Sequence, residues 1–132
     1  MNEPSIFTKI ILGDIPAHKI YEDEKTLAFL DISPMQPGHT LIVPKVQVDR
    51  LENLADEDYA AVMDTTRKVM KRVVEVFGQE YRACTKVIGF DVPHAHVHVV
   101  PCRSGAEFHD FTPPADEPDH DALTAMAEKL RF

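Results

Sequence analysis

Three histidines alternate with apolar residues in the segment 94–100, which reads HAHVHVV. In an extended strand every second side chain points to the same face, so His94, His96 and His98 would share one face while the alanine and valines take the other. Pro93 and Pro101 flank the segment, and proline is tolerated mainly at strand ends because it cannot donate to a ladder. The spacing therefore predicts a short strand with one reactive face.

Clustered imidazoles support two kinds of chemistry. They can bind a metal ion, since neutral histidine is the commonest protein ligand and two histidines one residue apart on a strand can share an ion. They can also supply a nucleophile together with neighbours that orient it and stabilise charge on a phosphoryl group. His96 is central on the shared face, which favours it as the nucleophile. A metal site of His94, His96 and His98 is the weaker hypothesis, because no aspartate, glutamate or cysteine at ligand spacing completes the shell.

The predicted elements are a short helix, three strands, a long helix, two strands and a last helix. Ser5 is expected to cap a short helix that ends at Leu12, before Gly13. A helix is predicted over 55–77, because its apolar residues recur every three or four positions, its first turn is acidic and Gly78 follows it. Strands are expected at 19–23, 26–31, 39–44, 80–88 and 94–100, and a last helix at 119–130. Short turns between neighbouring strands favour an antiparallel sheet of about five strands with helices packed on one face, an α+β fold.

Two further polar residues lie next to the predicted third strand. Asp31 opens the loop 31–38, whose two prolines and one glycine indicate a rigid loop that can carry function. His39 begins the strand that follows. From the residues alone, Asp31 could equally be a solvated turn residue and His39 a structural histidine.

The composition fits one globular domain without structural disulfides. The 132 residues carry a formal net charge of −8, which argues against a nucleic-acid partner, because phosphate backbones are bound by concentrated lysine and arginine. A small phosphorylated ligand is still compatible with this charge, since a pocket can be locally electropositive. Cys84 and Cys102 match no metal-ligand spacing and are expected to be reduced thiols. No signal-peptide pattern or bilayer-spanning apolar run is found, so a cytoplasmic protein without membrane contact is expected.

The histidine pattern resembles the signature of the histidine triad (HIT) family of nucleotide-binding proteins, and it matches at each of the seven positions. Four other blocks, 7–17, 21–23, 27–34 and 38–45, resemble the Hint-type branch of that family. The resemblance extends from Ile6 to about Arg103. We therefore expect a single HIT domain over 1–132, with its core at about 6–103 and a C-terminal tail at 104–132.

The resemblance implies a substrate class and a binding site. Members of the Hint-type branch are homodimers that bind purine nucleotides and hydrolyse nucleoside phosphoramidates or related adenylates. By resemblance, Asp31 would hold the ribose hydroxyls and Ile32 would line the base pocket. His39 would join the triad from the neighbouring strand, which makes it a functional residue.

The resemblance also implies a mechanism that uses the histidines. His96 would attack the α-phosphorus and form a covalent nucleotidyl intermediate, and its tautomer would be fixed by a neighbouring backbone carbonyl or by another histidine. His98 would stabilise charge on the phosphate oxygens, while His94 and His39 would order the site. This chemistry requires no metal or other cofactor.

The segment before the histidines departs from the family pattern. Many Hint-type proteins have Gly-Gln-Ser-Val or a similar segment there, whose polar residues contact the phosphate, but this chain has Gly89-Phe90-Asp91-Val92. Phe90 cannot donate a hydrogen bond, and an ionised Asp91 would repel a phosphate. Asp91 is therefore either protonated in the site or used differently, and protonation of the leaving group is one such use.

These observations predict a hydrolase that acts on P–N or P–O–P bonds of a purine nucleotide conjugate. Two alternatives stay open. One is a nucleotide-binding module with little or no turnover, which Phe90 and Asp91 make more credible, and the other is a dinucleoside polyphosphate hydrolase. A homodimer is expected because the apolar stripe from Tyr59 to Phe77 is longer than one small sheet covers.

Overall fold

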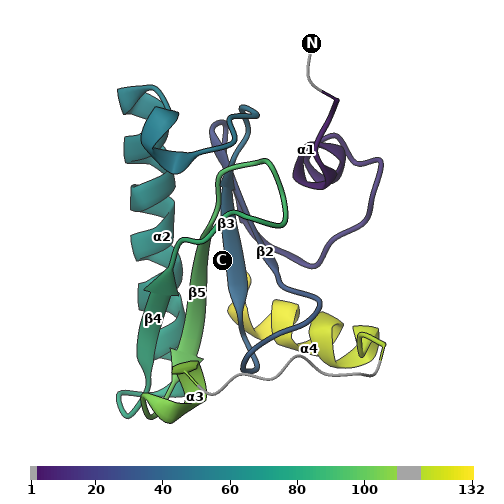
Figure 1. The fold of residues 1–132 in the computed structure, drawn as a ribbon. Coiled ribbons are helices and arrows are strands. Elements are labelled where there is room, and N and C mark those ends of the chain that lie inside the picture. Colours follow the sequence, from purple (N-terminus) through teal and green to yellow (C-terminus); the bar gives the residue numbers. More distant parts are fainter. Residues whose placement is uncertain (1–2, 110–116) are drawn as a thin grey trace.

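The computed structural model describes residues 3–109 and 117–132. Its centre is an antiparallel sheet of five strands in the order β1-β2-β3-β5-β4 (Figure 1). The strands are β1 (Lys19–Glu22), β2 (Thr26–Leu30), β3 (Thr40–Pro44), β4 (Arg82–Lys86) and β5 (Val97–Cys102). The predicted α+β fold with about five antiparallel strands is confirmed.

A tight hairpin joins β1 to β2, as expected from the sequence. The Asp23 carboxylate closes it, because Oδ1 accepts hydrogen bonds from the N–H groups of Lys25 at 2.9 Å and Thr26 at 2.8 Å. Aspartate side chains commonly stabilise turns in this way. The hairpin places β2 beside β3, and both of these central strands are buried at every position.

Two helices cover one face of the sheet. In α2 (Asp56–Phe77), Val62, Val69 and Val73 are fully buried, and α4 (His120–Leu130) adds Leu130 to the same core. Both helices agree with the predicted ranges to within one residue. A short 3-10 turn, Leu51–Asn53, leads into α2. No helix in residues 3–109 and 117–132 is both long and apolar enough to cross a membrane.

A third helix lies on the opposite face, so the expectation that helices pack on one face is wrong. Figure 1 shows α1 (Ile6–Ile11) on the side of the sheet away from α2. Ser5 caps α1 as predicted, since its Oγ accepts a hydrogen bond from the Thr8 N–H at 3.0 Å. Phe7 and Ile10 are buried on this face in a second core cluster, together with Leu27, Phe29, Leu41 and Val43. The central strands are apolar on both faces, so both faces need a cover.

The histidine strand begins later and ends later than predicted. β5 pairs with β3 only from Val97 onward and with β4 only from His98 onward, so residues 94–96 precede the ladder. The Ala95 N–H donates instead to the Val48 carbonyl at 2.7 Å. Pro101 lies inside β5 rather than after it. It follows Val99, which is the last residue of β5 that pairs with β3. β4 is correspondingly shorter than the predicted strand 80–88. The alternation of faces nevertheless holds, because Ala95, Val97 and Val99 belong to the core under α2.

The expected C-terminal tail begins with a short helix, α3 (Ala106–His109), and residues 110–116 lie outside the described residues. α4 is attached to the body of the protein at its end. Arg72 of α2 donates hydrogen bonds to the carbonyls of Leu130 and Lys129, each at 3.0 Å. The two cysteines are free: Cys102 is buried and Cys84 is half-buried.

Candidate functional site

A pocket of about 420 Å³ opens on the face of the sheet that carries α1. The segment that connects β4 to β5 and the loop between β2 and β3 form its other walls. Six of the seven predicted site residues line it: Asp31, Ile32, His39, Asp91, His96 and His98. Apolar residues of α1, β2 and β3, including Phe7, Ile10, Phe29 and Leu41, line the same space. The pocket therefore combines polar groups with an apolar wall, as ligand sites usually do.

The hydrogen bonds of His96 determine its tautomer. Its Nδ1 lies 2.7 Å from the carbonyl oxygen of His94, and a carbonyl can only accept, so Nδ1 carries the proton. The lone pair is then on Nε2. Residues 3–109 and 117–132 give that nitrogen no hydrogen-bond partner. The His96 ring is buried, with 7% of its surface exposed, and its Nε2 is available to a ligand in the pocket.

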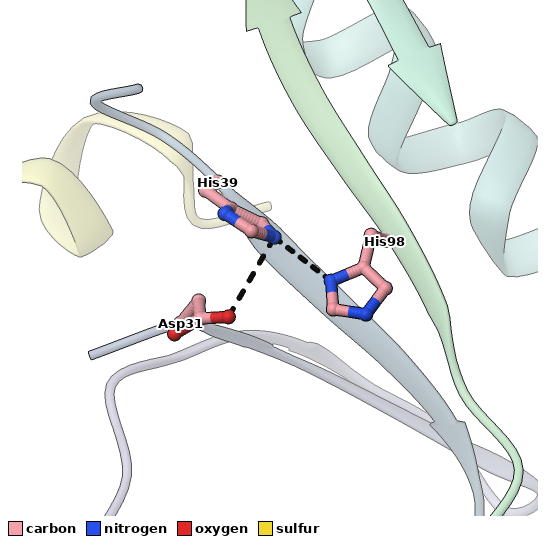
Figure 2. Close-up of side chains that lie close together, drawn as sticks. All are labelled: Asp31, His39 and His98. Carbon is pink, nitrogen blue, oxygen red and sulfur yellow. Dashed lines mark hydrogen bonds and ion pairs between the residues drawn. The ribbon is translucent and has the colours of Figure 1, made fainter. Parts of the chain in front are cut away.

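A second chain of hydrogen bonds sets the tautomers of His39 and His98. The Met35 N–H donates to His39 Nδ1 at 3.0 Å, so the proton of His39 is on Nε2. Figure 2 shows that this Nε2 faces Nδ1 of His98, 2.9 Å away. His39 is therefore the donor in this pair, and His98 must carry its own proton on Nε2. His98 can donate that N–H to a ligand.

Burial keeps both of these imidazoles neutral. Desolvation lowers the pKa of His39 to about 4, and the positive charge of Lys86 acts in the same direction. The pKa of His98 falls to about 3, again chiefly by desolvation, with the neighbouring His39, His96 and Lys86 adding to the effect. A neutral His98 keeps its Nδ1 as an acceptor and its Nε2–H as a donor at physiological pH.

Asp31 contributes a carboxylate to the wall next to His39. Its Oδ1 accepts a hydrogen bond from the Ser33 N–H at 2.8 Å, while Oδ2 lies 3.6 Å from His39 Nε2, too far for a hydrogen bond (Figure 2). Burial raises the pKa of Asp31, and the Ser33 N–H and the charge of Lys86 oppose that rise. Ile32, which is half exposed, follows directly and presents an apolar side chain to the pocket.

His94 is the predicted site residue that does not line this pocket. Its ring is fully buried, and both ring nitrogens have protein partners. Nε2 donates to the Pro44 carbonyl at 2.8 Å, so Nδ1 is an acceptor and receives the Ser5 hydroxyl hydrogen at 2.7 Å. Because His94 offers no free nitrogen, a metal site formed by His94, His96 and His98 does not fit this arrangement.

Another group of possible metal ligands exists in the described part of the chain: Asp31, His39 and His98, whose ligand atoms lie within 4.8 Å of one another. Their hydrogen bonds do not suit an ion. His39 Nδ1 already accepts the Met35 N–H, and His39 Nε2 carries the proton that is donated to His98 Nδ1. A metal would have to displace that proton and break the bond between the two rings.

Comparisons with known proteins place the chain in a family. A profile of the HIT domain matches residues 13–105. A HIT-like protein of Methanocaldococcus jannaschii is 38% identical over 103 residues, which cover 76% of this chain and 80% of that protein. The chain belongs to the histidine triad (HIT) family. The adenosine 5′-monophosphoramidase HNT1 of Candida albicans is 33% identical over 96% of this chain and 88% of its own length. The crystal structure of a Hit-like protein from Bartonella henselae has a TM-score of 0.84 at 29% identity, covering 99% of this chain and 96% of that one.

This HIT-family site contains one charged residue that the sequence analysis does not single out. Lys86, at the end of β4, lines the pocket and acts electrostatically on Asp31, His39 and His98. The signal for it is the strand register, since Lys86 pairs with His98 across β4 and β5. Residue spacing in the sequence does not predict that pairing, because the segment between β4 and β5 contains no regular structure.

The two unusual residues of this HIT-family chain lie at the rim of the pocket. Phe90 is 92% exposed, and Asp91 is also exposed. The charge of an exposed carboxylate is screened by water, so Asp91 repels a phosphate in the pocket only weakly. Lys86 contributes a positive charge to the same pocket, opposite to the charge of a phosphate. The departure from the family pattern is therefore compatible with a phosphate-containing ligand.

Proposed function

We propose that this HIT-family protein hydrolyses purine nucleoside phosphoramidates or adenylates through a covalent nucleotidyl intermediate on His96. The observation that carries the proposal is the hydrogen bond from His96 Nδ1 to the His94 carbonyl, which leaves the Nε2 lone pair facing a pocket. A neutral imidazole held with a free nitrogen toward its substrate is an effective nucleophile. The similarity to adenosine 5′-monophosphoramidase HNT1 of Candida albicans supports the substrate class.

In the proposed complex the two ends of the pocket bind different parts of the nucleotide. The apolar wall of Phe7, Ile10 and Phe29, together with Ile32, takes the purine base. The ionised Asp31 carboxylate, which can only accept hydrogen bonds, receives the ribose hydroxyl hydrogens. The α-phosphate then lies against the histidines. This orientation uses the binding energy of the nucleoside to hold the phosphorus near His96.

In the first chemical step, His96 Nε2 forms a bond to phosphorus and the bond from phosphorus to the leaving amine breaks. The amine departs with a proton that Asp91 relays from solvent at the rim. The Nε2–H of His98 and the Lys86 ammonium stabilise the negative charge on the non-bridging oxygens. In the second step, water attacks phosphorus and loses a proton to solvent, the bond to His96 breaks with its electron pair returning to Nε2, and nucleoside monophosphate is released.

The test uses His96→Gly with adenosine 5′-monophosphoramidate as substrate. Loss of a nucleophile costs several orders of magnitude in rate, whereas loss of a charge-stabilising group costs about 10²–10³-fold. We therefore expect no measurable turnover by His96→Gly, residual turnover by His98→Ala, and binding of adenosine monophosphate within a few fold of wild type in both. Rapid-quench mass spectrometry should find the nucleotide on His96. Adduct on another residue, or undiminished turnover by His96→Gly, would contradict the mechanism.

The binding-module alternative rests on Phe90 and Asp91, which replace polar residues that contact phosphate in many relatives. It predicts that calorimetry detects adenosine monophosphate binding to the wild type while no phosphoramidate, adenylated lysine or dinucleoside polyphosphate is hydrolysed. Preferred turnover of the dinucleoside polyphosphate would instead favour the other alternative. The same panel of substrates therefore separates all three functions.

A further inference from the structure

A network of side chains behind the pocket holds the ring of His94. The Ser5 hydroxyl donates to His94 Nδ1 at 2.7 Å, and the Thr8 hydroxyl lies 3.3 Å from the same nitrogen. Gln47 supports both of them, because its Oε1 accepts the Ser5 N–H and the Thr8 hydroxyl hydrogen, each at 2.7 Å. The network thus joins the start of α1, the segment after β3 and the histidine segment.

The direction of every bond in this network is fixed. The Pro44 carbonyl requires the proton of His94 on Nε2, so Nδ1 can only accept. Ser5 must then donate to His94, while its oxygen accepts the Thr8 N–H as the cap of α1. The hydroxyl of Thr8 is committed to Gln47. In a site this buried, a partner that is removed leaves an unpaired polar group.

The network reaches the proposed nucleophile through the backbone of His94. The carbonyl of that residue is the acceptor that keeps the proton on His96 Nδ1. Residues 94–96 lie outside the β5 ladder, so the sheet does not orient this carbonyl. Its position depends on the two anchors of the His94 ring and on the N–H groups of His94 and Ala95, which donate to the Val92 and Val48 carbonyls.

We propose that Ser5, supported by Thr8 and Gln47, is a positioning residue that fixes the reactive tautomer of His96. Without the Ser5 hydroxyl, the His94 ring keeps one anchor and its carbonyl gains freedom. His96 then spends part of its time with the proton on Nε2, where the lone pair needed for attack is lost. The inference rests on the proposed function for its kinetic consequence, but the tautomer itself is a property of the free protein.

The test compares Ser5→Ala with Ser5→Thr, which keeps a hydroxyl and the helix cap. For Ser5→Ala we expect kcat on adenosine 5′-monophosphoramidate to fall about tenfold, because loss of a partner that orients a functional histidine typically has an effect of this size. KM should change less than twofold. Ser5→Thr should recover most of the loss. Thr65→Val is the matched control, since it removes a buried hydroxyl of α2, 2.7 Å from Thr26 Oγ1, on the other face of the sheet.

Nitrogen-15 NMR of the imidazole rings gives a second measurement that needs no turnover. The wild type and Thr65→Val should show His96 protonated on Nδ1 alone, and Ser5→Ala should show a second tautomer. If Ser5→Ala does not fold, Gln47→Met replaces it, with Gln47→Glu as the variant that keeps both acceptor contacts. An unchanged His96 tautomer in a folded Ser5→Ala or Gln47→Met protein would overturn the inference. A wild type that shows these tautomers but no turnover would contradict the proposed function alone.

Discussion

At the scale of single residues, the two nitrogens of each histidine have different roles, and backbone groups assign them. The alternation of residues 94–100 predicts which side chains share a face, and it favours His96 as the central imidazole. It does not predict the tautomers, because the partners are the His94 carbonyl, the Met35 N–H and the Pro44 carbonyl. For the same reason the sequence does not separate His94 from the other histidines. Only the position of α1 shows that His94 is covered.

The low pKa values of His39 and His98 predict a loss of stability in acid. Both lie below the ordinary value of about 6.5, so the unfolded chain takes up protons first as the pH falls. The free energy of unfolding should therefore decrease by several kcal/mol from pH 6.5 toward pH 4, and these two groups should have almost no effect above pH 7. The raised pKa of Asp31 acts in the opposite direction and offsets part of the loss at the acid end.

Urea denaturation at pH 6.5 and pH 4.5 measures this effect. His98→Asn removes one of the two depressed groups, so its stability should decrease less between the two pH values than that of the wild type. Equal decreases in the two proteins would show that His98 does not titrate as expected.

The hydrogen bonds around His39 also predict that the protein works without a metal ion. Zinc at Asp31, His39 and His98 would have to remove the proton shared by the two rings. Purified protein should therefore contain much less than one equivalent of zinc by atomic emission spectroscopy. Turnover of a phosphoramidate should be unchanged after EDTA treatment. Activity that is lost in EDTA and restored by zinc would instead assign the site to a metal.

At the scale of secondary structure, periodicity predicts the elements well and their ends less well. The helix 55–77 is found almost unchanged, because its apolar stripe, acidic start and terminal Gly78 all agree. The strand expected at 80–88 loses residues at both ends, and the histidine strand moves toward Cys102. These boundaries depend on where a partner strand begins to pair. That is a property of the sheet rather than of the segment.

The attachment of α4 is a second feature that the segment alone does not predict. Arg72 donates to two carbonyls in its last turn, where helix carbonyls lack partners. Arg72→Met should lower the free energy of unfolding by about 1–3 kcal/mol, the usual range for a hydrogen bond from a charged group. Urea denaturation measures this, and Lys71→Met, an exposed neighbour in α2, is the control. The same stability in both variants would show that α4 is held by its apolar contacts alone.

At the scale of the whole molecule, the central strands are covered on both faces, and the site lies where one cover is incomplete. α2 and α4 close one face of β2 and β3, whereas the short α1 covers only part of the other. The remaining space is the pocket, which is lined by residues of α1 and of the segment before β5. The order of elements predicts the sheet, but it does not predict that the first helix crosses to the opposite face. That placement depends on strands that are apolar on both sides.

The outer side of α2 predicts a homodimer. The sheet buries Val62, Val69 and Val73, yet Tyr59 and Met63 of the same helix stay 44% and 39% exposed. β4, at one edge of the sheet, also has an unpaired side in residues 3–109 and 117–132. Exposed apolar side chains beside an open edge favour pairing with a second copy.

We therefore expect light scattering at micromolar concentration to give twice the mass of one chain. Met63→Glu places a charge on the outer side of α2 and should shift the equilibrium to the monomer, because burying an unpaired carboxylate in an interface is costly. Leu12→Glu is the matched control: Leu12 is 66% exposed and follows α1, on the other side of the sheet. It should leave the mass unchanged. A wild type with the mass of one chain would contradict the dimer, and dissociation by Leu12→Glu but not by Met63→Glu would place the interface on the α1 side instead.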